Sequence, residues 1–174
     1  MKNLKYIFLF LLMSCSSSKV IYDYDKEADF NQYKTYHIFE NAGEGLNKFD
    51  VDRLVSKIDI EMSLHGFKKQ ENPDFFIDFK SKKTEAQNNN TIGIGIGNFG
   101  RNGGIGISGG IPIGSKKLNE EITIDFVEAK NQQLFWQGIL TSKINEKTTP
   151  EKREMYFADV VKKILSKYPP EKIK

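Results

Sequence analysis

Residues 121–144, EITIDFVEAKNQQLFWQGILTSKI, decide the fold of this chain. The stretch divides into two runs in which apolar and polar residues alternate, with AKNQQ at 129–133 between them. Such runs around a short polar segment predict a β-hairpin with one buried face. The apolar positions are Ile122, Ile124 and Phe126 in the first run and Leu134, Trp136 and Leu140 in the second. We interpret Trp136 as a core residue, with a binding hot spot as the alternative.

Two earlier stretches also predict strands. The sequence VIYDYDKEADFNQYKTYHIFE at 20–40 opens as an extended run, breaks at its acidic residues and resumes as a strand over about 33–40. NPDFFIDF at 72–79 predicts a turn followed by a strand with one buried face. The inward residues of that strand are Phe75, Ile77 and Phe79. The polar stretch SKKTEAQNNN at 81–90 is expected at the surface or partly disordered.

Two helices are predicted by apolar residues that recur every three or four positions. The first begins at Asp50, which we expect to be its N-cap, and ends near Gly66. The second takes a threonine of TTP at 148–150 as its N-cap, has the proline in its first turn, and is stopped by the prolines at 169–170. The apolar stripes are Val51, Leu54, Val55, Ile58 and Met62 in the first helix, and Phe157, Ala158, Val161, Ile164, Leu165 and Tyr168 in the second.

The predicted order of elements is strand, helix, strand, glycine-rich hairpin, strand, strand, helix. This order indicates an α+β fold, with a mainly antiparallel sheet of four to six strands and two helices packed on one face.

Composition limits the classes of protein to which the chain can belong. Its 174 residues are 39% hydrophobic and 28% charged, which suits one globular domain with short tails. The net charge is +3, and the lysines are mixed with acidic residues, so the basic face of a nucleic-acid binder is not expected. A single cysteine excludes an intramolecular disulfide and a thiolate metal cluster. We expect no cofactor and no metal.

The amino terminus has the pattern of a secretory leader. Lys2 and Lys5 precede the apolar run YIFLFLLM at 6–13, and small polar residues follow. A membrane-spanning helix needs about 20 apolar residues, so this run is too short to be one. The leader ends in LMSC, which resembles a bacterial lipobox. Residues 1–14 would then be a lipoprotein signal peptide, and Cys15 would be the residue that carries the lipid.

Lipidation predicts the location of the protein. Several acyl chains on Cys15 would hold it firmly at a membrane, with residues 15–19 as a flexible lipidated tether. Ser16, and not aspartate, follows the cysteine. By resemblance to the sorting rule of proteobacteria, this favours the outer membrane, with the protein facing the periplasm. The alternatives are an uncleaved signal anchor and a leader that is cut elsewhere.

The glycine-rich stretch TIGIGIGNFGRNGGIGISGGIPIG, at 91–114, alternates isoleucine with glycine on both sides of NFGRN. This pattern predicts a hairpin with one bare face, which would allow close approach of another backbone, a membrane surface or a partner strand. The alternative is a flexible insertion between sheet strands. Gly95, Gly97 and Gly100 match a dinucleotide fingerprint, but no helix can follow them, so we reject that function.

No set of residues in the sequence identifies a catalysed reaction. His37 is expected as a packed or edge residue of a strand, and His65 as a residue at a helix end. The alternating acids of DYDKEAD at 23–29 lack the glycine and glutamate of a calcium loop. The sequence therefore offers no catalytic residue, and Cys15 is its one candidate site residue.

Four segments are similar in order and spacing to the DUF4136 family, a group of envelope lipoproteins of unknown function common in Bacteroidetes and proteobacteria. They are VIYDYDKEADFNQYKTYHIF, LHGFKKQENPDFFIDF, EITIDFVEAKNQQLFWQGIL and VVKKILSKYPP. The resemblance covers residues 20–170, and the family also tends to have glycines where this chain has them. Gln137 replaces the family's usual arginine, and Glu128 its usual aspartate. The resemblance implies a single lipoprotein domain with helices against a sheet, followed by a tail at 171–174, and it transfers no activity.

Three functional hypotheses follow. The first is a non-enzymatic, membrane-tethered envelope lipoprotein that acts as a binding or scaffold module, with the membrane and an envelope protein as partners. The second is an envelope enzyme with a nonstandard site that uses His37 or His65. The third is a structural protein whose glycine-rich hairpin adds a strand to a partner's sheet.

Overall fold

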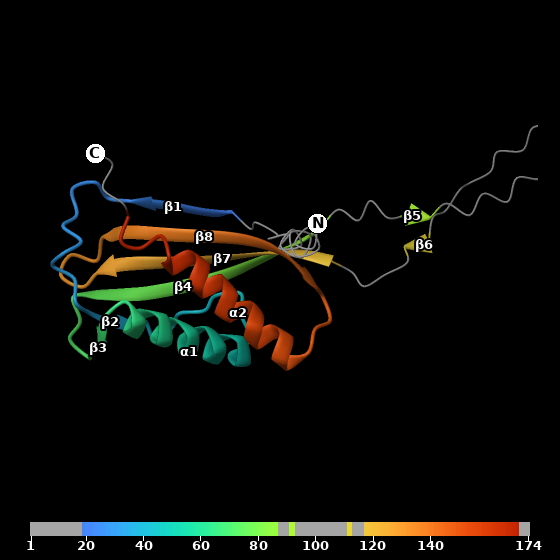
Figure 1. Ribbon diagram of the computed structural model, residues 1–174, viewed down its shortest axis with the longest axis horizontal. Helices are drawn as coiled ribbons and strands as arrows, with labels where there is room; N and C mark the ends of the chain where they lie inside the picture. Colours follow the sequence, from blue (N-terminus) through green and yellow to red (C-terminus); the bar gives the residue numbers. More distant parts are fainter. Residues whose placement is uncertain (1–18, 87–90, 93–110, 113–116, 171–174) are drawn as a thin grey trace, which may run out of the picture.

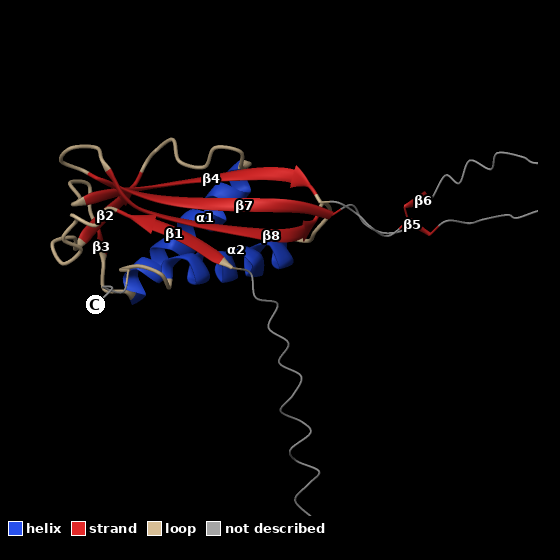
Figure 2. Cartoon of the chain, turned by 90° about the horizontal axis from the view of Figure 1, so that it is seen from above, coloured by secondary structure: helices blue, strands red, loops and turns tan. Residues whose placement is uncertain are grey.

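Six strands form one sheet, and two helices cover one of its faces (Figures 1 and 2). The computed structural model describes residues 19–86, 91–92, 111–112 and 117–170. The strand order is β1-β8-β7-β4-β2-β3. The strands of this sheet are β1 (Val20–Tyr24), β2 (Thr35–Ile38), β3 (Lys68–Lys69), β4 (Phe75–Glu85), β7 (Lys117–Glu128) and β8 (Leu134–Asn145). The helices are α1 (Lys48–Leu64) and α2 (Pro150–Leu165), and β5 (Thr91–Ile92) and β6 (Ile111–Pro112) pair separately.

The sheet is mixed, so the predicted α+β class is confirmed but the mainly antiparallel sheet is not. Strand β2 runs parallel to both of its neighbours, β4 and β3. The reason is that α1 carries the chain back along the sheet between β2 and β4, and such a crossover returns it in the same direction. The predicted order also differs from the structure, which has two strands before α1 and two directly after it.

Helix α1 begins earlier than the sequence pattern suggests. Its N-cap is Asn47, whose side chain accepts a 3.1 Å hydrogen bond from the Asp50 backbone N–H. The prediction that Asp50 is the N-cap is therefore wrong, because Asn47 takes that role and Asp50 lies buried in the first turn. Gly66 does end the helix, in the left-handed conformation (φ +86°) that glycine adopts without strain.

Helix α2 is close to its prediction. Thr149 is the N-cap, its hydroxyl accepts from the Lys152 N–H, and Pro150 opens the first turn. The expected apolar face is buried apart from Ala158, which is half-buried, and Val160 joins it.

The hairpin of β7 and β8 contains a β-bulge at Phe135. Phe126 pairs with Trp136 but the next residue, Val127, pairs with Leu134, so Phe135 is an extra residue on β8. Phe135 and Trp136 are consequently both buried, whereas Leu134 is 51% exposed. The prediction that Leu134 joins the apolar row is wrong because the bulge reverses the alternation at that point.

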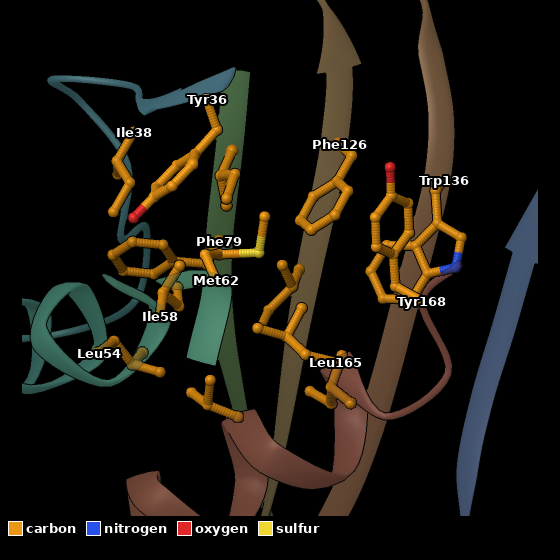
Figure 3. Close-up of a cluster of buried hydrophobic side chains, with 14 of the residues drawn as sticks. Tyr36, Ile38, Leu54, Ile58, Met62, Phe79, Phe126, Trp136, Leu165 and Tyr168 are labelled. Atoms are coloured by element: carbon orange, nitrogen blue, oxygen red, sulfur yellow. The ribbon is translucent and has the colours of Figure 1, made fainter. Parts of the chain in front are cut away.

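One core lies between the sheet and the helices, and its centre is aromatic (Figure 3). Tyr168, just after α2, packs edge-on against Phe126 and Trp136, with ring centroids 4.7 and 5.4 Å away. The expectation that Trp136 is a core residue is confirmed, since it is fully buried. Gly138 lies beside it on β8, and a β-carbon there would come within 2.6 Å of the Trp136 ring and 2.5 Å of Ile164.

The β4–β7 ladder runs further than predicted. Residues Ser81–Glu85 belong to β4 and pair with Leu118–Ile122, so this part of the expected surface stretch is a strand. Most of the glycine-rich stretch lies outside the described residues. Its two described pairs are Thr91 with Pro112 and Ile92 with Ile111. They have the same register as the β4–β7 ladder: in both ladders, the numbers of two paired residues add to the same total.

We predict that Gly138→Ala destabilises the fold by about 2 kcal/mol, the usual cost of overpacking a filled core. The added methyl group must displace Trp136 or Ile164. Chemical denaturation of the variant and the parent measures the difference. Gly66→Ala is the matched control, because nothing lies within 4 Å of the added carbon there and only the cost of the left-handed backbone, about 1 kcal/mol, is expected. A Gly138→Ala variant as stable as the parent would show that the close contacts at Gly138 are relieved without cost.

Candidate functional site

Three buried charged side chains meet where both helices begin. They are Asp50 of α1, Glu120 of β7 and Arg153 of α2, which are 4%, 0% and 7% exposed. Each is held by a different part of the fold, so the group joins both helices to the sheet. We call these three residues the charge cluster.

Arg153 is the centre of the charge cluster. Its Nε and Nη2 donate to the same Asp50 carboxylate oxygen at 3.1 and 3.0 Å. Its Nη2 also donates to Glu120 Oε1 at 2.7 Å, and its Nη1 to Glu120 Oε2. The guanidinium therefore bridges two carboxylates and holds one of them in bidentate geometry, which is a strong form of charged hydrogen bond.

Further contacts complete the charge cluster. Glu120 accepts a 3.0 Å hydrogen bond from the Ser81 hydroxyl and lies 3.5 Å from Lys83 Nζ. Asp50 pairs with Arg53 at 2.9 Å. The Arg153 guanidinium carbon lies 4.2 Å from the centre of the Phe157 ring, within the range of a cation–π contact.

The pKa directions follow from this geometry. Burial alone would raise the pKa of Asp50 and Glu120, but the hydrogen bonds and charge of Arg153 outweigh it and hold both pKa values below their ordinary range. The two carboxylates in turn raise the pKa of Arg153 against the effect of its burial. All three groups are therefore charged at neutral pH.

An open depression of about 420 Å³ lies over the charge cluster. The ends of β7 and β8 and the first turns of both helices line it, and its cationic side chains are Arg53, Lys83, Lys147 and Arg153. The lining also offers the hydroxyl groups of Thr148 and Thr149. It contains no histidine or cysteine, so no pairing of a nucleophile with an imidazole base is available there.

The structure places the histidines apart from this depression. His37 lies in β2, with Nδ1 3.0 Å from the Gln70 carbonyl oxygen and its ring against Phe76. His65 is the C-cap of α1, as the sequence suggested. Cys15, the candidate lipid-attachment residue, lies outside the described residues.

Sequence reasoning missed the charge cluster, although a signal for it was present. Asp50 lies four residues before Leu54 on the apolar stripe of α1, and Arg153 lies four residues before Phe157 on that of α2. Glu120 lies two residues before Ile122, on the inward face of its strand. A charged residue at a position that continues the spacing of the apolar residues indicates a charge that is buried and paired.

The described part of the chain contains no group of histidine, cysteine and acidic residues that could hold a metal ion. Among the same residues, no helix is long and apolar enough to cross a membrane.

These elements define an α+β domain in which two helices pack on one face of a mixed six-stranded sheet. The model of the family described as "Domain of unknown function (DUF4136)" matches residues 20–170, and the chain belongs to this family. No protein of curated function matches the chain.

Two solved structures share the fold at low sequence identity, and a third is similar at a lower TM-score. A PDZ domain protein from Parabacteroides distasonis is 14% identical with a TM-score of 0.57, and the match covers 89% of this chain but only 36% of that protein. PelC from Paraburkholderia phytofirmans, solved as a dodecamer, is 9% identical with a TM-score of 0.51 over 86% of this chain and 96% of PelC. Lipoprotein GNA1162 from Neisseria meningitidis has a TM-score of 0.45 and 8% identity, over 76% of this chain and 99% of that protein.

We predict that Arg153→Met lowers the free energy of unfolding by about 4 kcal/mol at pH 7, because two buried carboxylates lose the guanidinium that bonds both of them. Denaturant unfolding measures the loss. The triple variant Asp50→Asn, Glu120→Gln, Arg153→Met is the control, since it removes all three charges and should recover much of the stability. If the triple variant is no more stable than Arg153→Met, lost packing and not unpaired charge explains the effect.

The stability should also depend on pH differently in the parent, which should not change between pH 7 and pH 5, and in Arg153→Met. In the parent, Asp50 and Glu120 have lowered pKa values, so their contribution is complete above about pH 5 and is lost as the pH falls through those values. In Arg153→Met, burial without the guanidinium raises both pKa values, so acidification from pH 7 to pH 5 should stabilise the variant. Unfolding curves at several pH values test this, and parallel pH profiles would contradict it.

Proposed function

We propose that the protein is a membrane-tethered bacterial envelope lipoprotein that acts as a non-enzymatic binding or scaffold module. The lipid would be carried by Cys15, and the folded domain would face the periplasm from the outer membrane. The observation that carries the proposal is the LMSC sequence at 12–15 after an apolar leader. The domain begins almost directly after it, with β1 at Val20.

The short spacing between Cys15 and β1 supports a tether and not a long linker. Five residues span at most about 17 Å when extended, so the domain would stay close to the membrane surface. Membership of the DUF4136 family is compatible with this arrangement.

The chemistry of the charge cluster supports a non-enzymatic role. Both of its carboxylates are bonded to Arg153, so neither is poised to take a proton from a substrate at neutral pH. Its links to both helices and the sheet suit a structural part of the domain. We therefore assign the charge cluster to stability and the binding role to the surface.

The first test is acylation of Cys15. In cells fed a clickable fatty acid, the parent chain should be labelled and should sediment with membranes, because two or more acyl chains hold a protein firmly there. Cys15→Ala should lose the label and the membrane association together. Cys15→Ser is a second variant that keeps the size of the side chain. Labelling that persists in both variants, or an unlabelled parent, would contradict the proposal.

A second candidate function is strand addition by the glycine-rich stretch. The observation that favours it is that β5 and β6, which form a separate two-stranded sheet, pair in the same register as the β4–β7 ladder. Strands that extend beyond a sheet offer backbone groups to a partner.

To test this function, residues 93–110 would be replaced by the two-residue turn Asn-Gly, which preserves the pairing of Ile92 with Ile111. We expect crosslinking to envelope partners to fall while the melting temperature of the domain stays within a few degrees of the parent value. The control replaces the same residues with a glycine-serine linker of equal length. Undiminished crosslinking in the Asn-Gly variant would exclude the function.

A further inference from the structure

The two edges of the sheet are protected to different degrees. The edge at β3 is only two residues long, and both are lysines, which discourages pairing with another chain. The edge at β1 is five residues long, VIYDY, and contains neither proline nor lysine. It is paired to β8 over its whole length without a bulge. Figure 1 shows β1 along the border of the sheet.

The alternation of hydrogen bonds between β1 and β8 shows which backbone groups of β1 point away from β8 and could pair with another strand. Just after the strand, the Asp25 N–H donates to the Phe135 carbonyl oxygen at 3.0 Å, in the same register as the β1–β8 pairing. In an antiparallel pair, every second residue directs its backbone N–H and C=O groups to the neighbouring strand. Asp23 and Ile21 therefore bond to β8. The backbone groups of Val20, Tyr22 and Tyr24 point away from it. The Tyr24 N–H is already bonded to the Asp23 side chain at 2.9 Å. The backbone groups of Val20 and Tyr22 have no partner among the described residues.

Two large apolar or aromatic side chains of β1 are also exposed to solvent. Ile21 is 63% and Tyr22 41% exposed. Ile21 lies beside Ile139 on the face of the sheet that the helices do not cover. Lys19 precedes the strand, and Asp23 lies near its other end, so the edge is basic at one end and acidic at the other.

We infer that β1 pairs with β1 of a second copy of this chain, antiparallel across a two-fold axis at Ile21. In this register Val20 and Tyr22 of each copy exchange backbone hydrogen bonds with Tyr22 and Val20 of the other, which uses the free groups of both edges. The two Ile21 side chains meet at the axis. Lys19 of each copy lies opposite Asp23 of the other, where opposite charges attract.

The edge is self-complementary, and this is why a second copy is the occupant. An isologous contact requires that one patch fit itself, and the antiparallel arrangement brings the basic end of each β1 to the acidic end of the other. A register centred on Asp23 would oppose two carboxylates, and one centred on Tyr22 would require the Tyr24 N–H to leave its bond to Asp23. The proposal does not depend on lipidation of Cys15.

Cysteine crosslinking in intact envelopes tests the register. Residues directly opposite in a non-hydrogen-bonded antiparallel pair have Cα atoms about 4.5 Å apart, which a disulfide can span. In the full chain, Ile21→Cys should form a covalent dimer on mild oxidation at least about tenfold faster than Tyr22→Cys or Thr141→Cys. Thr141 is exposed on the same face of β8 and serves as the control for random collision. The parent chain reports any disulfide made by Cys15 itself.

The crosslinking result can overturn the inference in two ways. If Tyr22→Cys couples faster than Ile21→Cys, the register centred on Ile21 is wrong. If Ile21→Cys couples no faster than Thr141→Cys, there is no β1–β1 contact.

A backbone variant separates strand pairing from side-chain contact. Tyr22→Pro removes an N–H that points away from β8, so no hydrogen bond within the sheet is lost, and proline is tolerated at such edge positions. Added to Ile21→Cys, it should slow disulfide formation about tenfold or more, whereas Tyr22→Ala, which keeps the N–H, should slow it much less. Resistance of the domain to protease confirms that each variant is folded. Equal crosslinking in the proline and alanine variants of a folded domain would overturn the inference.

Discussion

The guanidinium of Arg153 is the point on which the two helices and the sheet depend. It lies in the interior, where an unpaired charge is very costly, and it bonds to one carboxylate from α1 and one from β7. Arg153 holds Glu120 in bidentate geometry, which fixes the start of α2 against β7. Its hydrogen bonds to Asp50 join the start of α1 to the same point.

The aromatic core and the charge cluster occupy different parts of the same layer. Tyr168 and the rings around it fill the space at the end of α2 (Figure 3). The charge cluster closes the layer where α2 begins. Between them, Gly138 leaves room for Trp136 to lie flat along β8. On the opposite face, Asp125 accepts from Gln137 at 2.6 Å and lies 3.3 Å from Lys80 Nζ. That polar arrangement suits a sheet face that the helices leave uncovered.

Local patterns in the sequence predicted what depends on local chemistry. The hairpin, the stripes of both helices, the cap at Thr149 and the stop at Gly66 each follow from residues a few positions apart. The parallel pairing of β2 could not be predicted in this way, because it depends on where α1 returns the chain. The bulge at Phe135 also escaped, since two buried aromatic residues in succession fit either phase of a strand. Each member of the charge cluster could be recognised as out of place on its stripe, but only the fold shows that the three meet.

The contacts that complete the domain join residues far apart along the chain. Val20 pairs with Leu140, and Asp50 and Arg153 are separated by 103 positions. Such contacts form slowly, because a long loop must close before they give any stabilisation. A chain emerging from its amino terminus cannot pair β1 until β8 has appeared, and cannot bond Asp50 to Arg153 until α2 has appeared. The order of synthesis therefore leaves both of these contacts unformed until most of the chain has appeared.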